Sequence, residues 1–379
     1  GVVMDGMFLG TSSGVLLDNF DIERIEVLRG PQGTLFGKNT TGGILNVIRT
    51  PVSLNDTSVD LSATAGSYGR QDIKAVVQVP IVQDTLGLKL FAANVQHDGH
   101  VYNTTLKRDA GGDDKANYGF AALWEPSDSF NMKLHYEIMK DKSEQGVYTN
   151  RNVVGELACT ITAIGFDPDN GCEKDANDGP DVTESDSANY SDNSYKSTIL
   201  TANYDTDSFL YTYIYSQRDM DEENLQDFDG SAADLLSMNF FNDWKQTSHE
   251  FRITSQFSET FQFIAGVYDW ESDFKQRWDV YDLFYQLSRL GVPPWGTGRQ
   301  GVAGYSDVFP WESDVAGNNG QTQITTSTAL FFSGDWYLND QWTATLGFRK
   351  TKEKKDFVGG ASAPGYYPLR GEAWPGIYN

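Results

Sequence analysis

The side chains that could carry catalytic or metal chemistry are scattered along this chain. The four histidines, His97, His100, His135 and His249, show no repeated metal-ligand spacing. The Asp and Asn residues near 167–181 do not fit the template of a calcium-binding loop. No catalytic constellation accompanies them. We therefore expect neither an enzyme, nor a metal site, nor a bound cofactor.

Two cysteines, Cys159 and Cys172, are the only ones in the chain, and both lie in one polar stretch rich in Gly and Asp. We favour a disulfide within a loop, formed in an oxidising compartment. Two unpaired thiols are the alternative, and a metal site would lack further ligands nearby.

Four aromatic residues lie in a segment near 276–311 that we expect to be a long loop: Trp278, Trp295, Tyr305 and Trp311. Their rings could stack on a sugar or on a catecholate. Alternatively, they build a small core for the loop itself. In both cases a framework must carry the loop, and the rest of the sequence predicts one.

From residue 57 onward, apolar and polar residues alternate with a period of two, which is typical of strands with two different faces. In the first of these rows, for example, Val59, Leu61, Ala63 and Ala65 alternate with polar residues. The pattern predicts eleven strands, near residues 59–65, 73–79, 86–92, 118–124, 132–138, 198–204, 209–215, 251–257, 261–267, 330–338 and 342–348.

The connections between these strands alternate between very short and very long. The short ones are 80–85, 126–129, 205–207, 258–260 and 339–340, and the long ones lie near 98–116, 141–196, 218–246 and 271–322. Tight turns on one side and long loops on the other are the layout of a bacterial outer-membrane barrel. A soluble sandwich or a solenoid would not show this sidedness. Rings near the strand ends would form interfacial girdles: Trp124, Tyr136, Tyr204, Trp336 and Trp342.

The overall composition excludes two other classes. No window approaches the length of apolar sequence that a spanning helix needs. The net charge of −24 argues against binding to nucleic acid. Residues 141–193 hold 12 acids and 3 bases, and residues 218–243 hold 8 acids and 1 base. These segments would disfavour a strongly anionic ligand unless divalent cations intervene, or they are simply solvated.

Residues 1–52 break the alternation and carry a specific motif. The run from Phe20 to Arg49, FDIERIEVLRGPQGTLFGKNTTGGILNVIR, resembles the end of the plug domain of TonB-dependent receptors. The later segment from Trp342 to Lys355 is similar to a strand from the middle of the barrel in that family. The resemblance is strong in the plug and diffuse over the rest of the chain.

The residues of the motif also suit its local structure. Glycines permit sharp turns and close passage of the chain, and Pro31 can occupy a first helical position because its missing N–H is not needed there. The glycines are Gly30, Gly33, Gly37, Gly42 and Gly43.

Three charged residues, Arg24, Glu26 and Arg29, alternate on one face of a predicted plug strand. In a globular domain such a face is usually a solvated edge. In a plug inside a barrel the charges would face a polar wall. We therefore expect ion pairs with acids that face the lumen, such as Asp60, Asp72 or Glu137.

The resemblance implies active import through the outer membrane. A scarce ligand would bind outside, at the long loops and the plug apex, and contact with the TonB complex would then shift the plug. Ferric siderophores are the commonest ligands of the family, with haem, cobalamin and oligosaccharides as alternatives. By family layout the turn Thr11, Ser12, Ser13 and Gly14 is the candidate apex. Lipid and lipopolysaccharide of the outer membrane are the other expected partners.

We therefore expect a mainly β protein with two parts. Residues 1–52 would be the C-terminal part of a small α+β plug, and residues 53–379 the N-terminal half of a transmembrane antiparallel β-barrel. Bacterial single-chain barrels have an even number of strands, about 22 in the large transporters. Eleven strands therefore predict an internal fragment. A passive porin has no reason to carry residues 1–52, and a surface adhesin would lack the sided loops.

Overall fold

The computed structural model of the chain describes residues 1–11, 13–14, 20–37, 40–144, 146–149, 181–232, 236–282 and 319–361. Several residues with expected roles lie outside these ranges, so those expectations remain predictions. They are Ser12, Cys159, Cys172, Trp295, Tyr305 and Trp311.

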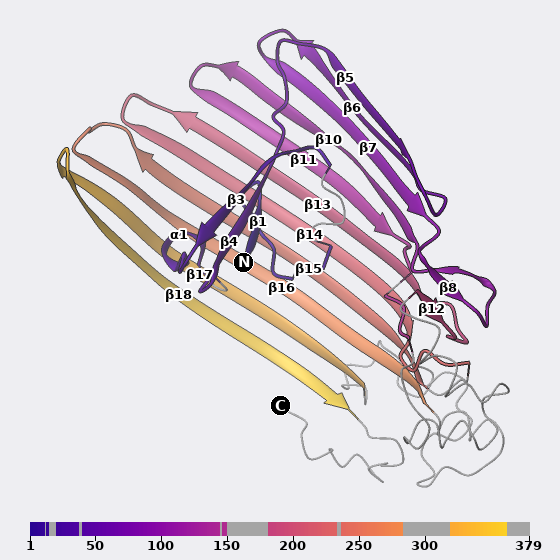
Figure 1. Cartoon of the computed structure of the whole chain (residues 1–379). Helices are drawn as coiled ribbons and strands as arrows, with labels where there is room; N and C mark the ends of the chain where they lie inside the picture. Colours follow the sequence, from indigo (N-terminus) through magenta and orange to yellow (C-terminus); the bar gives the residue numbers. More distant parts are fainter. Residues whose placement is uncertain are drawn as a thin grey trace.

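A single antiparallel sheet of eleven strands makes up most of the described chain (Figure 1). Its strands are β5 (Ser58–Ala65), β6 (Gln71–Val82), β7 (Leu86–His97), β10 (Asp113–Ser127), β11 (Phe130–Asp141), β13 (Tyr190–Asp205), β14 (Phe209–Asp227), β15 (Leu236–Ser255), β16 (Phe261–Asp282), β17 (Asn319–Asn339) and β18 (Trp342–Ala361). They are hydrogen-bonded in chain order from β5 to β18. The predicted eleven strands are confirmed, and each contains one of the alternating rows.

The two faces of this sheet differ as the alternation predicts. Apolar side chains of the rows, such as Leu61, Leu90 and Leu330, keep half or more of their surface exposed. Side chains at the positions between, such as Phe91 and Phe331, are buried on the concave face. An apolar convex face of this extent fits contact with lipid.

Four of the five expected girdle residues lie near the short turns. Trp124, Tyr204, Trp336 and Trp342 are exposed by 42–68% and stand within a few residues of a tight turn. Tyr136 instead lies in the middle of β11 and is half-buried. Figure 1 shows the short turns gathered at one end of the strands and the connection from β7 to β10 at the other end.

Several expected loops are shorter than predicted, because the strands continue beyond the apolar rows. Residues 218–243 belong mostly to β14 and β15, whose pairing extends to Asp227 and Ser237. Trp278 lies in β16 opposite Phe240 and not in a loop. Polar residues continue the pairing there, so hydrophobic periodicity no longer marks the strand.

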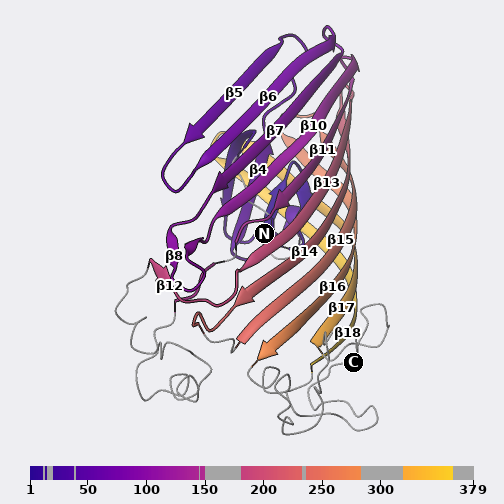
Figure 2. The same cartoon turned by 90° about the vertical axis from the view of Figure 1, so that its right-hand side faces the viewer.

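The expected loop 98–116 also contains regular structure. β8 (Val101–Asn103) and β9 (Arg108–Ala110) pair as a hairpin, and β12 (Val182–Thr183) adds to β8 in parallel. This small sheet lies at the end of the eleven-stranded sheet that is opposite the short turns (Figure 2).

Residues 1–49 form a separate mixed sheet on the concave side of the large one (Figure 2). Its strands are β1 (Val2–Met4), β2 (Met7–Phe8), β3 (Ile22–Arg29) and β4 (Gly43–Arg49), in the order β2-β1-β4-β3. Only the pair of β1 and β4 is parallel among these strands. We call this small sheet with its helix the plug, and the eleven-stranded sheet the wall.

A one-turn helix, α1 (Gly33–Phe36), connects β3 to β4. It begins two residues after Pro31, so the expectation that Pro31 occupies the first helical position was wrong. The close passage expected of the glycine pair occurs at Gly43, where φ is +135° and a Cβ would come 2.4 Å from the carbonyl oxygen of Leu28. A Cβ on Gly42 would meet nothing within 4 Å. In the described part of the chain, no helix has the length and apolar character needed to cross a membrane.

Candidate functional site

The segment after β2 is held against the wall by hydrogen bonds to its backbone. Gln246, only 1% exposed, accepts from the N–H of Gly10 (3.0 Å) and donates to the carbonyl oxygen of Phe8 (2.7 Å). Arg218 donates from Nη2 to the carbonyl oxygen of Ser13 (2.6 Å). We call the described residues between Leu9 and Gly14 the apex segment. It is clamped to the inner faces of β14 and β15 by these two side chains.

The wall around the apex segment carries an aromatic cluster, made of Met139, Tyr195, Met220, Trp244 and Trp270 with Tyr268 and Phe274 packed against it. The fit is close, since a Cβ on Gly10 would come 2.6 Å from the Trp244 ring and one on Gly14 2.6 Å from the Tyr195 ring.

Polar groups stand among these rings. The Arg218 guanidinium lies 5.5 Å from the centre of the Tyr195 ring, and the Tyr195 hydroxyl donates to Glu222 (2.7 Å). Arg218 is 2% exposed, and its Nη1 has no hydrogen-bond partner among the described residues. Rings of this kind can stack on a planar group, and a guanidinium can donate to an anionic oxygen. These side chains thus offer ring faces and a charged donor, the groups that suit a planar, oxygen-rich ligand.

A buried ion-pair network holds the plug against β10 and β11 of the wall. Arg49, the last residue of β4, pairs with Asp5 of the plug (3.1 Å) and with Glu137 of β11. Asn117 of β10 donates to the second oxygen of Glu137 (2.9 Å). Arg49 and Glu137 are each 5% exposed, so the pair is shielded from water.

The carboxylate of Asp5 stays ionised in this network. Burial alone would raise the pKa of Asp5, but the positive charges of Arg49 and Lys133 outweigh it and hold the pKa below its usual value. Nearby, Lys89 of β7 is fully buried and donates to Asp21 (2.5 Å) and to the carbonyl oxygen of Thr50 (2.6 Å). These charges tie one end of the β3 and β4 pair, where Ile22 lies opposite Arg49, to the wall.

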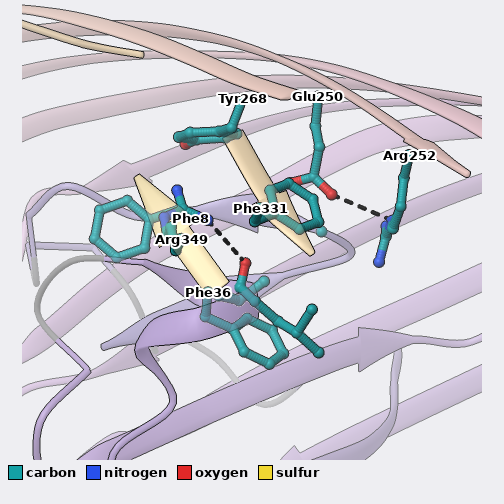
Figure 3. A pocket seen from close by; sticks show the side chains of 10 residues that line it. Phe8, Phe36, Glu250, Arg252, Tyr268, Phe331 and Arg349 are labelled. Atoms are coloured by element: carbon teal, nitrogen blue, oxygen red, sulfur yellow. Dashed lines mark hydrogen bonds and ion pairs between the residues drawn. The ribbon is translucent and has the colours of Figure 1, made fainter. Parts of the chain in front are cut away.

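The helix α1 packs on the last two described strands of the wall. Arg349 of β18 donates to the carbonyl oxygen of Leu35 (3.3 Å) and lies over the ring of Phe331. Between α1, the β1–β2 hairpin and this wall lies a cavity of about 90 Å³, and Figure 3 shows Arg349, Tyr268 and Glu250 around it.

The comparisons agree with this architecture. Residues 1–44 match the family model of the TonB-dependent receptor plug domain. The pesticin receptor of Yersinia pestis is 24% identical over 295 residues, which are 76% of this chain and 39% of that protein. The chain belongs to the TonB-dependent receptors.

Solved structures share the fold of this receptor. The ferric yersiniabactin uptake receptor FyuA from Yersinia pestis aligns with a TM-score of 0.67 at 16% identity, over 94% of this chain and 51% of that one. FpvA of P. aeruginosa, bound to a pyoverdine iron complex, aligns with a TM-score of 0.68 at 11% identity, over 94% and 47%. The chain thus spans about half of these structures and 39% of the curated relative. The receptor is a β-barrel protein of the bacterial outer membrane, and its described wall is part of that barrel.

The expected ligand residues are only partly brought together. Thr11 and Ser13 belong to the clamped apex segment, where Thr11 accepts from the N–H of Ser13 (3.3 Å). Trp278 lies far along β16, beyond the aromatic cluster, and is half-buried.

Among the described residues, the plug charges Arg24, Glu26 and Arg29 do not pair with the wall as expected. Arg24 pairs with Glu23 (2.9 Å) and Glu26 (2.8 Å), and Glu26 also accepts from Asn46 (2.9 Å), all within the plug. Arg29 is exposed. The wall acids named as partners also lie elsewhere, since Asp72 pairs with Arg70, Asp60 is exposed, and Glu137 pairs with Arg49. Arg24 and Arg29 of β3 are exposed, and no described wall residue pairs with them.

The pattern missed the side chains that hold the plug: Asp21, Arg49, Lys89, Arg218, Gln246 and Arg349. Only a weak feature of the sequence points to these side chains. Four of them lie at positions between the apolar residues of their strands, where a membrane barrel places its lumen side. Arg49 is the last residue of the family motif. The alternation predicts which side chains face the lumen. It does not predict at which position along each strand the plug contacts them.

Proposed function

We propose that the complete receptor imports a scarce ligand with energy from the TonB complex, and that the ligand is a ferric siderophore or another iron complex. The observation that carries this proposal is the apex segment, clamped on the wall beside an aromatic cluster and a buried guanidinium with one unbonded nitrogen. Two structurally similar proteins are described as a ferric yersiniabactin uptake receptor and as a receptor with a pyoverdine iron complex bound. Both descriptions support an iron complex.

Importers of oligosaccharide, haem or cobalamin are the alternatives within the family. Sugars also stack on tryptophan and tyrosine rings, so the cluster alone does not separate them from catecholates. The buried Arg218 favours a ligand with acidic oxygens. A passive porin or an adhesin is disfavoured, because a buried ion-pair network holds the plug inside the wall.

We assign the binding role to the apex residues Thr11, Ser12 and Ser13, together with Trp278 of β16 and the aromatic residues that follow it in the sequence, Trp295, Tyr305 and Trp311. We also propose that residue 52 divides the plug from the barrel. Contact with the TonB complex, the outer-membrane lipid and lipopolysaccharide follows from the same proposal.

Uptake of radiolabelled compounds by whole cells tests this function. Cells with and without the full-length gene would receive a labelled ferric siderophore or a labelled oligosaccharide at equal concentration. We expect gene-dependent and energy-dependent accumulation of the iron complex only. Expression that rises under iron limitation would agree. Gene-dependent accumulation of the oligosaccharide, or transcription of the gene together with glycan-degrading enzymes, would contradict the iron proposal.

A further inference from the structure

A second, larger cavity lies between the β1–β2 hairpin and the wall. Its volume is about 420 Å³, and it adjoins the smaller cavity, with which it shares Val3, Gly6, Phe36 and Arg252. On the wall it is lined by inward residues near the short turns, such as Asn131, Thr201 and Asn203. From Tyr195 in the apex cluster to Thr201, β13 advances by six residues, roughly 20 Å. The cavity therefore lies on the turn side of the apex segment.

The lining of this cavity offers charge and unsatisfied polar atoms. Lys133 projects from β11 with its Nζ 3.9 Å from Asp5, and Arg252 projects from β15 with its Nε 3.2 Å from Glu250. His135, 1% exposed, also lines the cavity. Its Nε2 lies 3.6 Å from Glu137, and its Nδ1 has no hydrogen-bond partner within the described ranges. A buried polar group without a partner is uncommon and calls for an explanation.

An apolar contact separates this cavity from the apex. Met7 and Leu9 of the plug pack on Ile199 and Ile214 of the wall, and all four are buried. The fit leaves no spare room, because a Cβ on Gly6 would come 2.9 Å from Ile214. Along this part of the described wall, a solute at the apex can reach the cavity when the β1–β2 hairpin moves away from β13 and β14.

We propose that this cavity is where the imported solute passes between plug and wall, and that Lys133 and Arg252 receive its acidic oxygens. The inference rests on the proposed import and adds the route. Elsewhere in the described wall the plug is joined by ion pairs and hydrogen bonds at Lys89, Glu137, Gln246 and Arg349. At the cavity the plug and the wall are joined by the longer ion pair of Lys133 and Asp5 (3.9 Å), and a polar gap lies between them.

The size of the gap fits a resting state. A volume of about 420 Å³ lies at the lower end of the roughly 300–1,000 Å³ of pockets that enclose drug-sized ligands. It can hold the acidic arm of an iron complex but leaves little space for a whole one. Retreat of the hairpin would add the remaining space. Because Asp5 lies in the turn of the hairpin, this movement would also disturb the buried network at Arg49.

The test blocks the cavity from the wall side in the full-length receptor. Thr201→Trp places a large ring in the cavity, and Ala202→Trp, the next residue on β13, places the same ring on the lipid-facing side. A radiolabelled ferric siderophore taken up by the wild type would be measured twice, as binding to de-energised cells on ice and as uptake by energised cells. We expect Thr201→Trp to keep wild-type binding and lose at least tenfold in uptake rate. Ala202→Trp should match the wild type in both.

Equal uptake by the two tryptophan variants would overturn the route and leave the proposed import intact. Failure of the wild type itself to bind or import any iron complex would instead overturn the proposed function. If Thr201→Trp does not assemble in the membrane, the double variant Lys133→Gln with Arg252→Gln decides. It should raise the KM of uptake at least fivefold with unchanged binding on ice, and an unchanged KM would overturn the proposal.

Discussion

Replacing Arg49 by alanine is expected to loosen the plug more than any exposed charge replacement on the same sheet. The change would leave Asp5 and Glu137 buried without their shared cation. Removing one partner of a buried ion pair destabilises by about 3–5 kcal/mol. The opening free energy of the plug strands should fall by that amount.

Hydrogen exchange of the full-length receptor in detergent or membranes measures this effect. Amide exchange in β1 and β4 should accelerate by about a hundredfold to a few thousandfold, since each tenfold corresponds to about 1.4 kcal/mol. Arg24→Ala is the matched control. Arg24 is half exposed and pairs only with plug acids at the surface among the described residues, so its loss should change exchange little.

A neutral replacement of the whole network is the second control for Arg49. Asp5→Asn, Arg49→Met and Glu137→Gln together remove every charge of the network, and slow exchange should largely return. If Arg49→Ala leaves exchange in β1 and β4 unchanged, the buried network does not hold the plug.

Replacing Arg218 by alanine should weaken ligand binding strongly. The side chain clamps Ser13 and has one buried nitrogen without a hydrogen-bond partner among the described residues. A hydrogen bond to a charged group contributes about 1.5–3 kcal/mol. Its loss therefore corresponds to an affinity about 10-fold to 150-fold lower for a ferric siderophore with acidic oxygens.

Equilibrium binding to the purified full-length receptor at fixed salt measures this change. Gln217→Ala removes a polar side chain from the neighbouring position on the opposite face of β14 and should leave the affinity unchanged. Arg218→Lys should restore part of it, because the charge remains while the guanidinium fork is lost. An affinity that is the same in Arg218→Ala and in the wild type would remove Arg218 from the binding site.

Much of the wall could be predicted from the sequence, because lipid on one side and a polar lumen on the other impose a period of two. Leu90 and Leu330 stand exposed on the convex face as the pattern predicts, with Phe91 and Phe331 buried on the other. The ends of β14, β15 and β16 were missed. Outside the apolar band both faces meet water, so the alternation ceases while the hydrogen-bonded pairing continues.

The contacts between plug and wall could be predicted only in part. Glu137 was expected to pair with a plug charge, and it does, but its partner is Arg49 and not Arg24 or Arg29. All three arginines lie in the family motif, and their spacing alone does not tell which one faces the wall. The placement of the plug decides it, because the end of β4 lies beside β11, whereas Arg24 and Arg29 of β3 are exposed.

The central claim, that the plug is seated against this wall, is tested most directly by a disulfide between the two. A Cβ on Gly347 of β18 would lie 3.5 Å from the Cβ of Thr34 in α1, within the range of about 3.5–4.5 Å in disulfides. Thr34→Cys with Gly347→Cys, in a full-length receptor that carries Cys159→Ser and Cys172→Ser, should crosslink on mild oxidation in the membrane. Mass spectrometry would find the joined peptides. Thr34→Cys with Leu346→Cys, whose side chain is 72% exposed on the convex face, should not crosslink. Absence of the 34–347 crosslink, with both thiols reactive after denaturation, would contradict the seated plug.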